Sequence, residues 1–345
     1  MQQHTHGLAG LYAGHFHTWA ERFAEACAAR RVDGVVVFSG RAQHRFRDDI
    51  AHPFFAEPYF KAWVPLTAPD AALKIVPGET PLLAHVQRAD YWHAPPEAPE
   101  GFWTQHFEIR PVADTTALLE ALGTPLGGLA ALGEAADASM GFATVNDPAL
   151  LGHLDYYRAC KTAYEIACMA AANRIAAAGH AAARAALADA PDRHSEFTLN
   201  QTYCAATRQR ESELPYPNIV ALNEHASTLH YQHLDREPPA AFRSFLLDAG
   251  AQFNGYASDV TRTLSGGGAG FDALIASMDA LQTRLCAGVR AGVSFVALND
   301  FAHRLLAEVL AEHALITCTA EEAYSRGITR SFLPHGLGHL LGLQV

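Results

Sequence analysis

Two aspartates and two histidines lie in segments whose residue types are those of a hydrolytic metal site. Asp248 and Asp259 are eleven residues apart in FLLDAGAQFNGYASDVTRT, and His335 and His339 follow in PHGLGH. Carboxylate oxygens together with imidazole nitrogen are ligands for divalent ions, and such ions can activate water for hydrolysis. The residues therefore predict metal-dependent hydrolysis if the fold brings these segments together.

The two aspartates are expected on the paired strands of a β-hairpin. Residues 242–250 predict one strand and residues 255–263 its return, with turn residues that include Asn-Gly at 252–255. The midpoint between the aspartates falls inside that turn, so the two side chains are predicted to lie opposite each other, with Cβ atoms about 4.5 to 5.5 Å apart. Two unpaired carboxylates would repel each other and raise one pKa, whereas they could bridge a divalent cation pair about 3.5 to 4 Å apart.

A hairpin without metal is the alternative for the same residues. In it, one aspartate caps a turn and the other pairs with Arg262 or Arg243. His230 in STLHYQH favours the metal, as do the glycines at 336 and 338, which let the backbone approach closely while the histidines of PHGLGH project. Oxygen ligands with a single imidazole suit Mn²⁺ or a similar hard divalent ion better than a structural zinc.

The first half of the chain predicts one mixed α/β domain, which we place at residues 1–155. Residues 18–30 carry apolar side chains at helical spacing, and residues 32–40 form a β-branched run closed by glycine, which is typical of a buried strand. Residues 117–122 and 127–134 add a second helix and a second strand. The expected fold class is therefore α/β (α+β).

The second half, which we place at residues 156–345, opens with a helix-forming stretch that is rich in Ala, Arg and Glu. Residues 156–189 predict one long helix or a helix pair broken near Gly179, and Ser195 suits the N-cap of the next helix. The elements expected after it are short strands at 214–223 and 225–231, the aspartate hairpin, and amphipathic helices within 264–289 and 294–315.

Composition excludes several classes of protein. The 345 residues carry 25 basic and 36 acidic side chains, a net charge of −11, and no basic run that would follow a phosphate backbone, so nucleic acid is not expected as a partner. The first residues lack the pattern of a signal peptide, and no stretch is apolar enough for a membrane span. Six scattered cysteines without a C-x-x-C pair suit reduced thiols, so we expect a soluble cytoplasmic protein without membrane partners.

The sequence resembles a known family over essentially its whole length. YPNIVALNEHASTLHY, LLDAGAQFNGYASDVTRT and PHGLGHLLGLQV resemble the prolidase (Xaa-Pro dipeptidase) branch of the pita-bread metallopeptidases, peptidase family M24. DDIAHPFFAEPYFKAWVP and DYWH resemble its bacterial short-form members. The resemblance implies a small creatinase-like N-terminal domain, a pita-bread catalytic domain, two divalent metal ions, a homodimer and an Xaa-Pro dipeptide as substrate. We expect Mn²⁺ as the metal, with Co²⁺, Fe²⁺ and Zn²⁺ as alternatives.

The resemblance also implies roles for single residues. Asp248 would bind one metal, Asp259 would bridge both, and His339 would be the imidazole ligand. His230 would handle protons or orient the substrate beside the metals, and Tyr216 would form a wall of the substrate pocket. For His335, substrate contact and a supporting or packing position stay open as equal alternatives.

One departure from the family pattern limits this expectation. The family completes its metal site with two glutamates after the HGxGH segment, and one of them is the general base, but no glutamate follows that segment here. We therefore expect a truncated catalytic domain without its C-terminal strands, which binds metal weakly, has little or no dipeptidase activity and is less soluble than the intact enzyme. The rival hypotheses are an aminopeptidase P, an organophosphate-hydrolysing relative, and a metal-free pita-bread module used for binding.

Overall fold

A six-stranded sheet organises the N-terminal part of the computed structural model, which describes residues 2–88, 91–92 and 98–345. In sheet order its strands are β4 (Glu108–Val112), β3 (Leu82–Val86), β2 (Ala71–Ile75), β1 (Gly34–Phe38), β5 (Leu129–Leu132) and β6 (Thr144–Val145). β1 pairs antiparallel with β2 and parallel with β5. The predicted buried strand is confirmed as β1. Asp90 and His93 of the DYWH motif lie outside the described residues.

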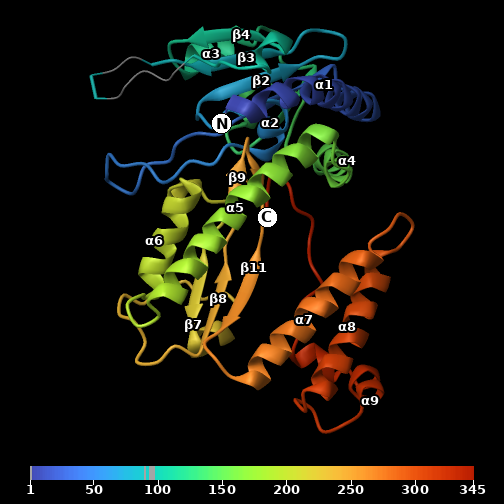
Figure 1. Cartoon of the computed structure of the whole chain (residues 1–345). Helices are drawn as coiled ribbons and strands as arrows, with labels where there is room; N and C mark the ends of the chain where they lie inside the picture. The colour runs from blue at the N-terminus through green and yellow to red at the C-terminus, as the bar shows by residue number, and fades with distance from the viewer. Residues whose placement is uncertain (1, 89–90, 93–97) are drawn as a thin grey trace.

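Helices cover both faces of this sheet (Figure 1). On one face, Val35 and Val37 join a core with helices α1 (Gln2–Arg30), α2 (Pro58–Trp63) and α4 (Pro148–Ala159). On the other face, Val36 and Phe38 pack against helix α3 (Thr115–Ala121). Because side chains alternate between the faces of a strand, an entirely apolar run such as β1 can supply both cores.

The C-terminal part places two helices on a three-stranded antiparallel sheet (Figure 1). The helices are α5 (Ala163–Asp189) and α6 (Glu196–Thr207), and the strands, in sheet order, are β11 (Thr261–Ser265), β8 (Ser244–Asp248) and β7 (Ile219–Leu222). Both alternatives for residues 156–189 are wrong, because the break lies between α4 and α5 at residues 160–162, and α5 is continuous at Gly179. Gly179 allows close helix packing instead, since a Cβ at this position would lie 2.5 Å from the Tyr203 ring of α6.

Local capping explains where the two helices begin. Thr162 caps α5 and forms a reciprocal capping box with Glu165, and the predicted N-cap Ser195 is confirmed at the start of α6. The strand predicted at residues 225–231 is wrong, because the 3₁₀ helix η4 (Asn223–Ser227) and a turn stand there. Asn223 adopts a positive φ of 55°, which turns the chain away from the sheet directly after β7.

Helices α7 (Ala269–Gly288) and α8 (Phe295–Glu312), both predicted, form a separate apolar cluster with each other, and the short helix α9 (Ala320–Ser325) follows. The segment after α9 returns to the junction of the two parts, where the Ala257 amide donates to the Gly342 carbonyl at 2.7 Å (Figure 1). The other short elements are η1 (Thr104–His106), η2 (Ala138–Met140), η3 (Glu211–Glu213), η5 (Ile328–Ser331), β9 (Gln252–Phe253) and β10 (Tyr256–Ala257). Within the described residues, no helix combines the length and the apolar character of a membrane span.

Candidate metal centre

The hairpin forms, but its turn is centred one position further along than predicted, so the residue opposite Asp248 is Thr261 instead of Asp259. Asn254 and Gly255 are the central turn residues, with φ angles of 50° and 83°, as a two-residue turn with both residues left-handed requires. Asp248 therefore faces Thr261 across the β8–β11 ladder. The prediction that Asp248 and Asp259 lie directly opposite each other is wrong, because it centred the turn between residues 253 and 254.

The two aspartates nevertheless meet, through a tyrosine from the segment before β7. The hydroxyl of Tyr216 lies 2.8 Å from Oδ1 of Asp248 and 3.0 Å from Oδ1 of Asp259. One hydroxyl carries one proton, so it can donate fully to only one of two ionised carboxylates. The aspartate pair, Asp248 and Asp259, thus shares a donor that would satisfy one of them.

His339 completes the group from the other end of the chain. Its Nε2 lies 3.3 Å from Oδ2 of Asp259, and its Nδ1 lies 2.9 Å from the Leu340 carbonyl oxygen. A carbonyl can only accept, so Nδ1 is the donor and Nε2 of the neutral ring points a lone pair toward Asp259. A lone pair facing a carboxylate is favourable only with a proton or a cation between them.

The electrostatics of the aspartate pair agree with that geometry. Burial and the neighbouring Asp259 both raise the pKa of Asp248, against hydrogen bonds from Tyr216 and Thr261 that lower it. Burial, followed by the two carboxylates, raises the pKa of the Tyr216 hydroxyl, which is therefore a proton donor at neutral pH. Two carboxylates and an imidazole nitrogen with unused lone pairs are a donor set that fits a hard divalent ion.

The remaining predicted site residues lie outside this group. His335 is exposed, and its Nδ1 lies 2.8 Å from the carbonyl oxygen of Gly336, the next residue. His230 is exposed on the loop between β7 and β8, and among the described residues it takes no part in the contacts that join the aspartate pair. The structure links Asp248, Asp259, His339 and Tyr216 in a chain of contacts, in which Tyr216 touches both aspartates and His339 touches Asp259.

Two neighbours of the aspartate pair were not singled out from the sequence. Thr261 hydrogen bonds to Asp248 and lies opposite it in the ladder. His180 of α5 hydrogen bonds through Nε2 to the Ala249 carbonyl at 3.1 Å, next to Asp248. A correct hairpin register would have identified Thr261, whereas nothing in the spacing of α5 distinguishes His180 from the many other histidines of the chain.

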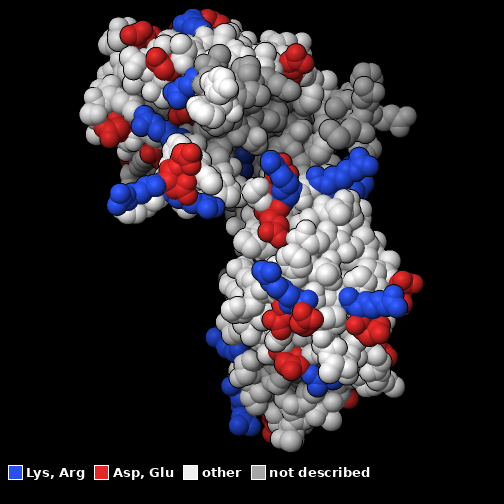
Figure 2. Space-filling view, turned by 90° about the vertical axis from the view of Figure 1, so that its left-hand side faces the viewer, with Lys and Arg blue, Asp and Glu red and all other residues white. Residues whose placement is uncertain are grey.

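Charge on the molecular surface is mixed in sign. On the face in Figure 2, lysine and arginine side chains are interspersed with aspartate and glutamate over both parts of the molecule. On that face the basic side chains of the described residues form no broad patch.

Both parts of the chain match known protein families. Residues 10–156 match the Xaa-Pro dipeptidase N-terminal domain, and residues 167–345 match metallopeptidase family M24. A curated Xaa-Pro dipeptidase from Xanthomonas campestris pv. campestris (strain B100) is 44% identical over 341 residues, which cover 98% of this chain and 76% of that protein. One from Shewanella amazonensis is 41% identical over 341 residues, or 98% of this chain and 77% of that protein.

Solved structures share the fold at lower sequence identity. Proline aminopeptidase P II from Yersinia pestis superposes with a TM-score of 0.71 at 22% identity, covering 94% of this chain and 82% of that chain. Zinc-substituted aminopeptidase P from E. coli superposes with a TM-score of 0.72 at 20% identity, covering 94% and 81%. The expected fold, a small α/β domain followed by a pita-bread domain, is confirmed by these neighbours.

Proposed function

The chain belongs to metallopeptidase family M24, and we propose that it hydrolyses dipeptides that end in proline. The curated relatives with 41% to 44% identity are Xaa-Pro dipeptidases, and the N-terminal match is to the domain of that enzyme. The observation that supports the proposal is the chain of contacts from Asp248 through Tyr216 to Asp259 and on to His339, which joins two distant segments and leaves lone pairs for a cation.

Membership of the family implies divalent metal ions, and we propose Mn²⁺ as the resident ion. Asp248, Asp259 and His339 would hold the metal, because their oxygen and nitrogen donors suit a hard divalent cation. When bound, such ions lower the pKa of water and polarise the scissile carbonyl. Tyr216 would donate its hydroxyl proton to the aspartate pair and keep the two carboxylates at a fixed separation.

The substrate is proposed to bind beside Tyr216, with its scissile carbonyl at the ions that the aspartate pair and His339 would hold. Tyr216 also lines a cavity of about 1300 Å³ with Pro215, Asn218 and residues of α6, which supports its role as a pocket wall. His230 would donate a proton to the developing charge on the reacting peptide, and His335 would contact the substrate or support His339.

An assay of the chain with added Mn²⁺ tests this proposal. Proline release from Xaa-Pro dipeptides is expected, and dialysis against a chelator should abolish it. Cleavage of Xaa-Pro-Xaa tripeptides in preference to dipeptides would favour an aminopeptidase P. Preferential hydrolysis of an organophosphate ester would favour an organophosphate-hydrolysing relative. Binding of dipeptide without Mn²⁺ uptake or cleavage would favour a binding module. Size-exclusion chromatography tests the proposed homodimer.

A further inference from the structure

His230 lies on a long loop, residues 223–243, which connects β7 to β8. Its side chain is exposed, and within the part of the chain that the structure describes it forms no hydrogen bond, ion pair or ring contact. The place of this histidine therefore depends on how the backbone of its loop is held.

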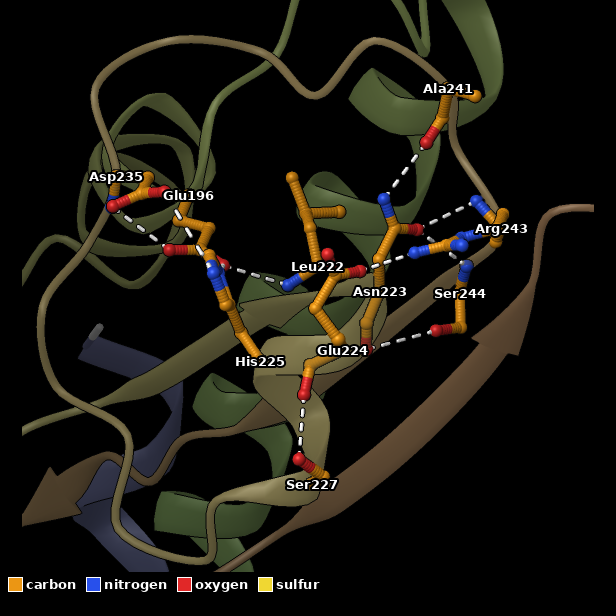
Figure 3. Close-up of polar contacts among 10 residues, drawn as sticks. All are labelled: Glu196, Leu222, Asn223, Glu224, His225, Ser227, Asp235, Ala241, Arg243 and Ser244. Atoms are coloured by element: carbon orange, nitrogen blue, oxygen red, sulfur yellow. Dashed lines mark hydrogen bonds and ion pairs between the residues drawn. The ribbon is translucent and has the colours of Figure 1, made fainter.

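Asn223 closes the base of the loop. Its Nδ2 donates to the Ala241 carbonyl at 2.8 Å, and its Oδ1 accepts from the backbone amides of Arg243 at 2.8 Å and Ser244 at 3.2 Å (Figure 3). An ion pair between Glu224 and Arg243 crosses the same gap. These contacts fix the two ends of the loop, but none of them reaches the segment around His230.

Glu196, the first residue of α6, holds the interior of the loop. It is 1% exposed. Its Oε1 accepts from the Leu222 amide at 2.9 Å and from Nδ1 of His225 at 2.8 Å, and its Oε2 accepts from the Asp235 amide at 2.8 Å (Figure 3). The Phe197 amide returns a bond to the Asp235 carbonyl at 3.1 Å. A buried carboxylate on a rigid helix thus ties down the loop before and after His230.

Tyr231 extends this anchor to the residue next to His230. It is 7% exposed, and its ring stacks on His225 with centroids 4.6 Å apart and planes inclined by 20°. Burial, followed by the hydrogen bond to Glu196, raises the pKa of its hydroxyl. Glu196, His225, Tyr231 and the Asp235 amide, which we term the Glu196 anchor, therefore bracket His230 along the chain.

A metal ion is the competing explanation for this cluster. Among the described residues, ligand atoms of Glu196, His225 and Asp235 lie within 4.8 Å of one another. Both oxygens of Glu196, however, already accept N–H groups, and a cation in contact with them would lie against those donors. The cluster is a hydrogen-bonded anchor in which the buried carboxylate is the shared acceptor.

We propose that Glu196 is a positioning residue, which through His225 and the Asp235 amide fixes His230 at the reacting dipeptide. The inference rests on the proposed role of His230. Glu196 itself touches neither substrate nor metal, so its effect on turnover passes entirely through the placement of that histidine. A displacement of the loop by about 1 Å is enough to lower turnover substantially.

Hydrogen exchange of the full chain, followed by mass spectrometry, tests the anchor without any need for activity. In Glu196→Gln the new amide group faces the N–H donors, so amide exchange across residues 223–235 should rise at least about tenfold, with α1 and β1 unchanged. His225→Phe keeps the ring stack on Tyr231 but removes the donor, and should show the same change. His233→Asn is the matched control, because His233 also contacts the Tyr231 ring but not Glu196.

Kinetics of the Mn²⁺-loaded chain test whether the anchor acts through His230. Glu196→Gln should lower kcat roughly 10- to 100-fold with little change in KM, and should have no further effect in a His230→Asn background. Unchanged exchange in both anchor variants overturns the proposal, and so do kcat losses that multiply in the double variant. If the unmutated chain with Mn²⁺ releases no proline, the proposed function fails, and exchange around His230 alone decides the anchor. Where Glu196→Gln does not fold, His225→Phe supplies both measurements.

Discussion

The aspartate pair and the Glu196 anchor contain the same kinds of side chain, carboxylates with a histidine and a tyrosine, yet they differ in how the carboxylates are satisfied. Glu196 is one carboxylate with three N–H donors on its two oxygens. Asp248 and Asp259 are two carboxylates with one tyrosine hydroxyl between them. The number of donors, more than the residue types, separates a structural carboxylate from one that is available to a cation.

The backbone explains this difference. Glu196 stands at a helix start and faces the Leu222 amide at the end of β7 and the Asp235 amide of the following loop. Asp248 lies in the middle strand of a three-stranded sheet, paired with Ile219 on one side and Thr261 on the other, where the backbone amides bond to neighbouring strands. A side chain on such a strand projects from the sheet and receives no ladder amide, so its lone pairs stay free.

The largest effect is expected for metal binding. Asp259→Asn removes an anionic ligand that contacts both Tyr216 and His339, so Mn²⁺ affinity should fall by about 10³-fold, which exceeds the 10- to 100-fold loss typical of outer-shell partners. Isothermal titration of the chelator-dialysed chain measures it. Glu196→Gln is the paired control and should keep the affinity of the unmutated chain. A loss in Glu196→Gln with none in Asp259→Asn would reverse the assignment of the two clusters.

For the free energy of unfolding, a substitution in the Glu196 anchor should have a larger effect than one in the aspartate pair. Glu196→Ala leaves two buried backbone amides and His225 without their acceptor, and should lower the free energy of unfolding by about 3 kcal/mol. Asp259→Ala relieves the repulsion with Asp248 in the metal-free chain, and should change it by less than about 1 kcal/mol. Urea unfolding in the presence of a chelator compares the two variants. Equal losses would show that donor number does not separate the clusters.

A smaller effect is expected from the hydroxyl that the aspartate pair shares. Tyr216→Phe removes the donor between Asp248 and Asp259, and should destabilise the metal-free chain by about 1 to 2 kcal/mol. With saturating Mn²⁺ the loss should shrink, since the cation then screens the two carboxylates. Unfolding with chelator and with Mn²⁺ gives both values. A loss that is the same in both conditions would mean that Tyr216 acts only through packing.

The sequence predicted correctly those elements that depend on signals within a few residues. The apolar run of β1, the N-cap Ser195 and the Asn254–Gly255 turn each determine their element within a few residues. The prediction that the two aspartates face each other failed because the central residues of the turn set the register. An error of one position in the turn centre changes the residue opposite Asp248 from 259 to 261. The prediction still identified Asp248, Asp259 and His339, which are linked by contacts in the structure, because the hairpin and the C-terminal segment were recognised from their residues.

The Glu196 anchor could not be predicted from local signals in the sequence. An acidic residue directly after a Ser N-cap is ordinary for the first turn of a helix, where it interacts favourably with the helix dipole. The partners of Glu196 are 26 to 39 positions away along the chain. Leu222 ends β7, His225 lies in the segment that was wrongly expected to be a strand, and Asp235 lies further along the loop. Only tertiary structure shows that this glutamate faces inward.

The smallest expected effect is the pH dependence of the contribution that His225 of the anchor makes to the free energy of unfolding. The hydrogen bond to Glu196 raises the pKa of His225 from its usual 6.5, against burial, which lowers it. The protonated ring is favoured in the folded state, so its stabilising contribution is complete below about pH 6.5 and is lost as the pH rises through the folded pKa. His225 is 36% exposed, and solvent screening limits the contribution to about 0.5 kcal/mol. The difference in unfolding free energy between the unmutated chain and His225→Phe should therefore be larger at pH 5.5 than at pH 8.5. A difference that grows with pH would mean that the neutral ring, held by stacking on Tyr231, supplies the stability, and that Glu196 acts on the loop through the backbone amides alone.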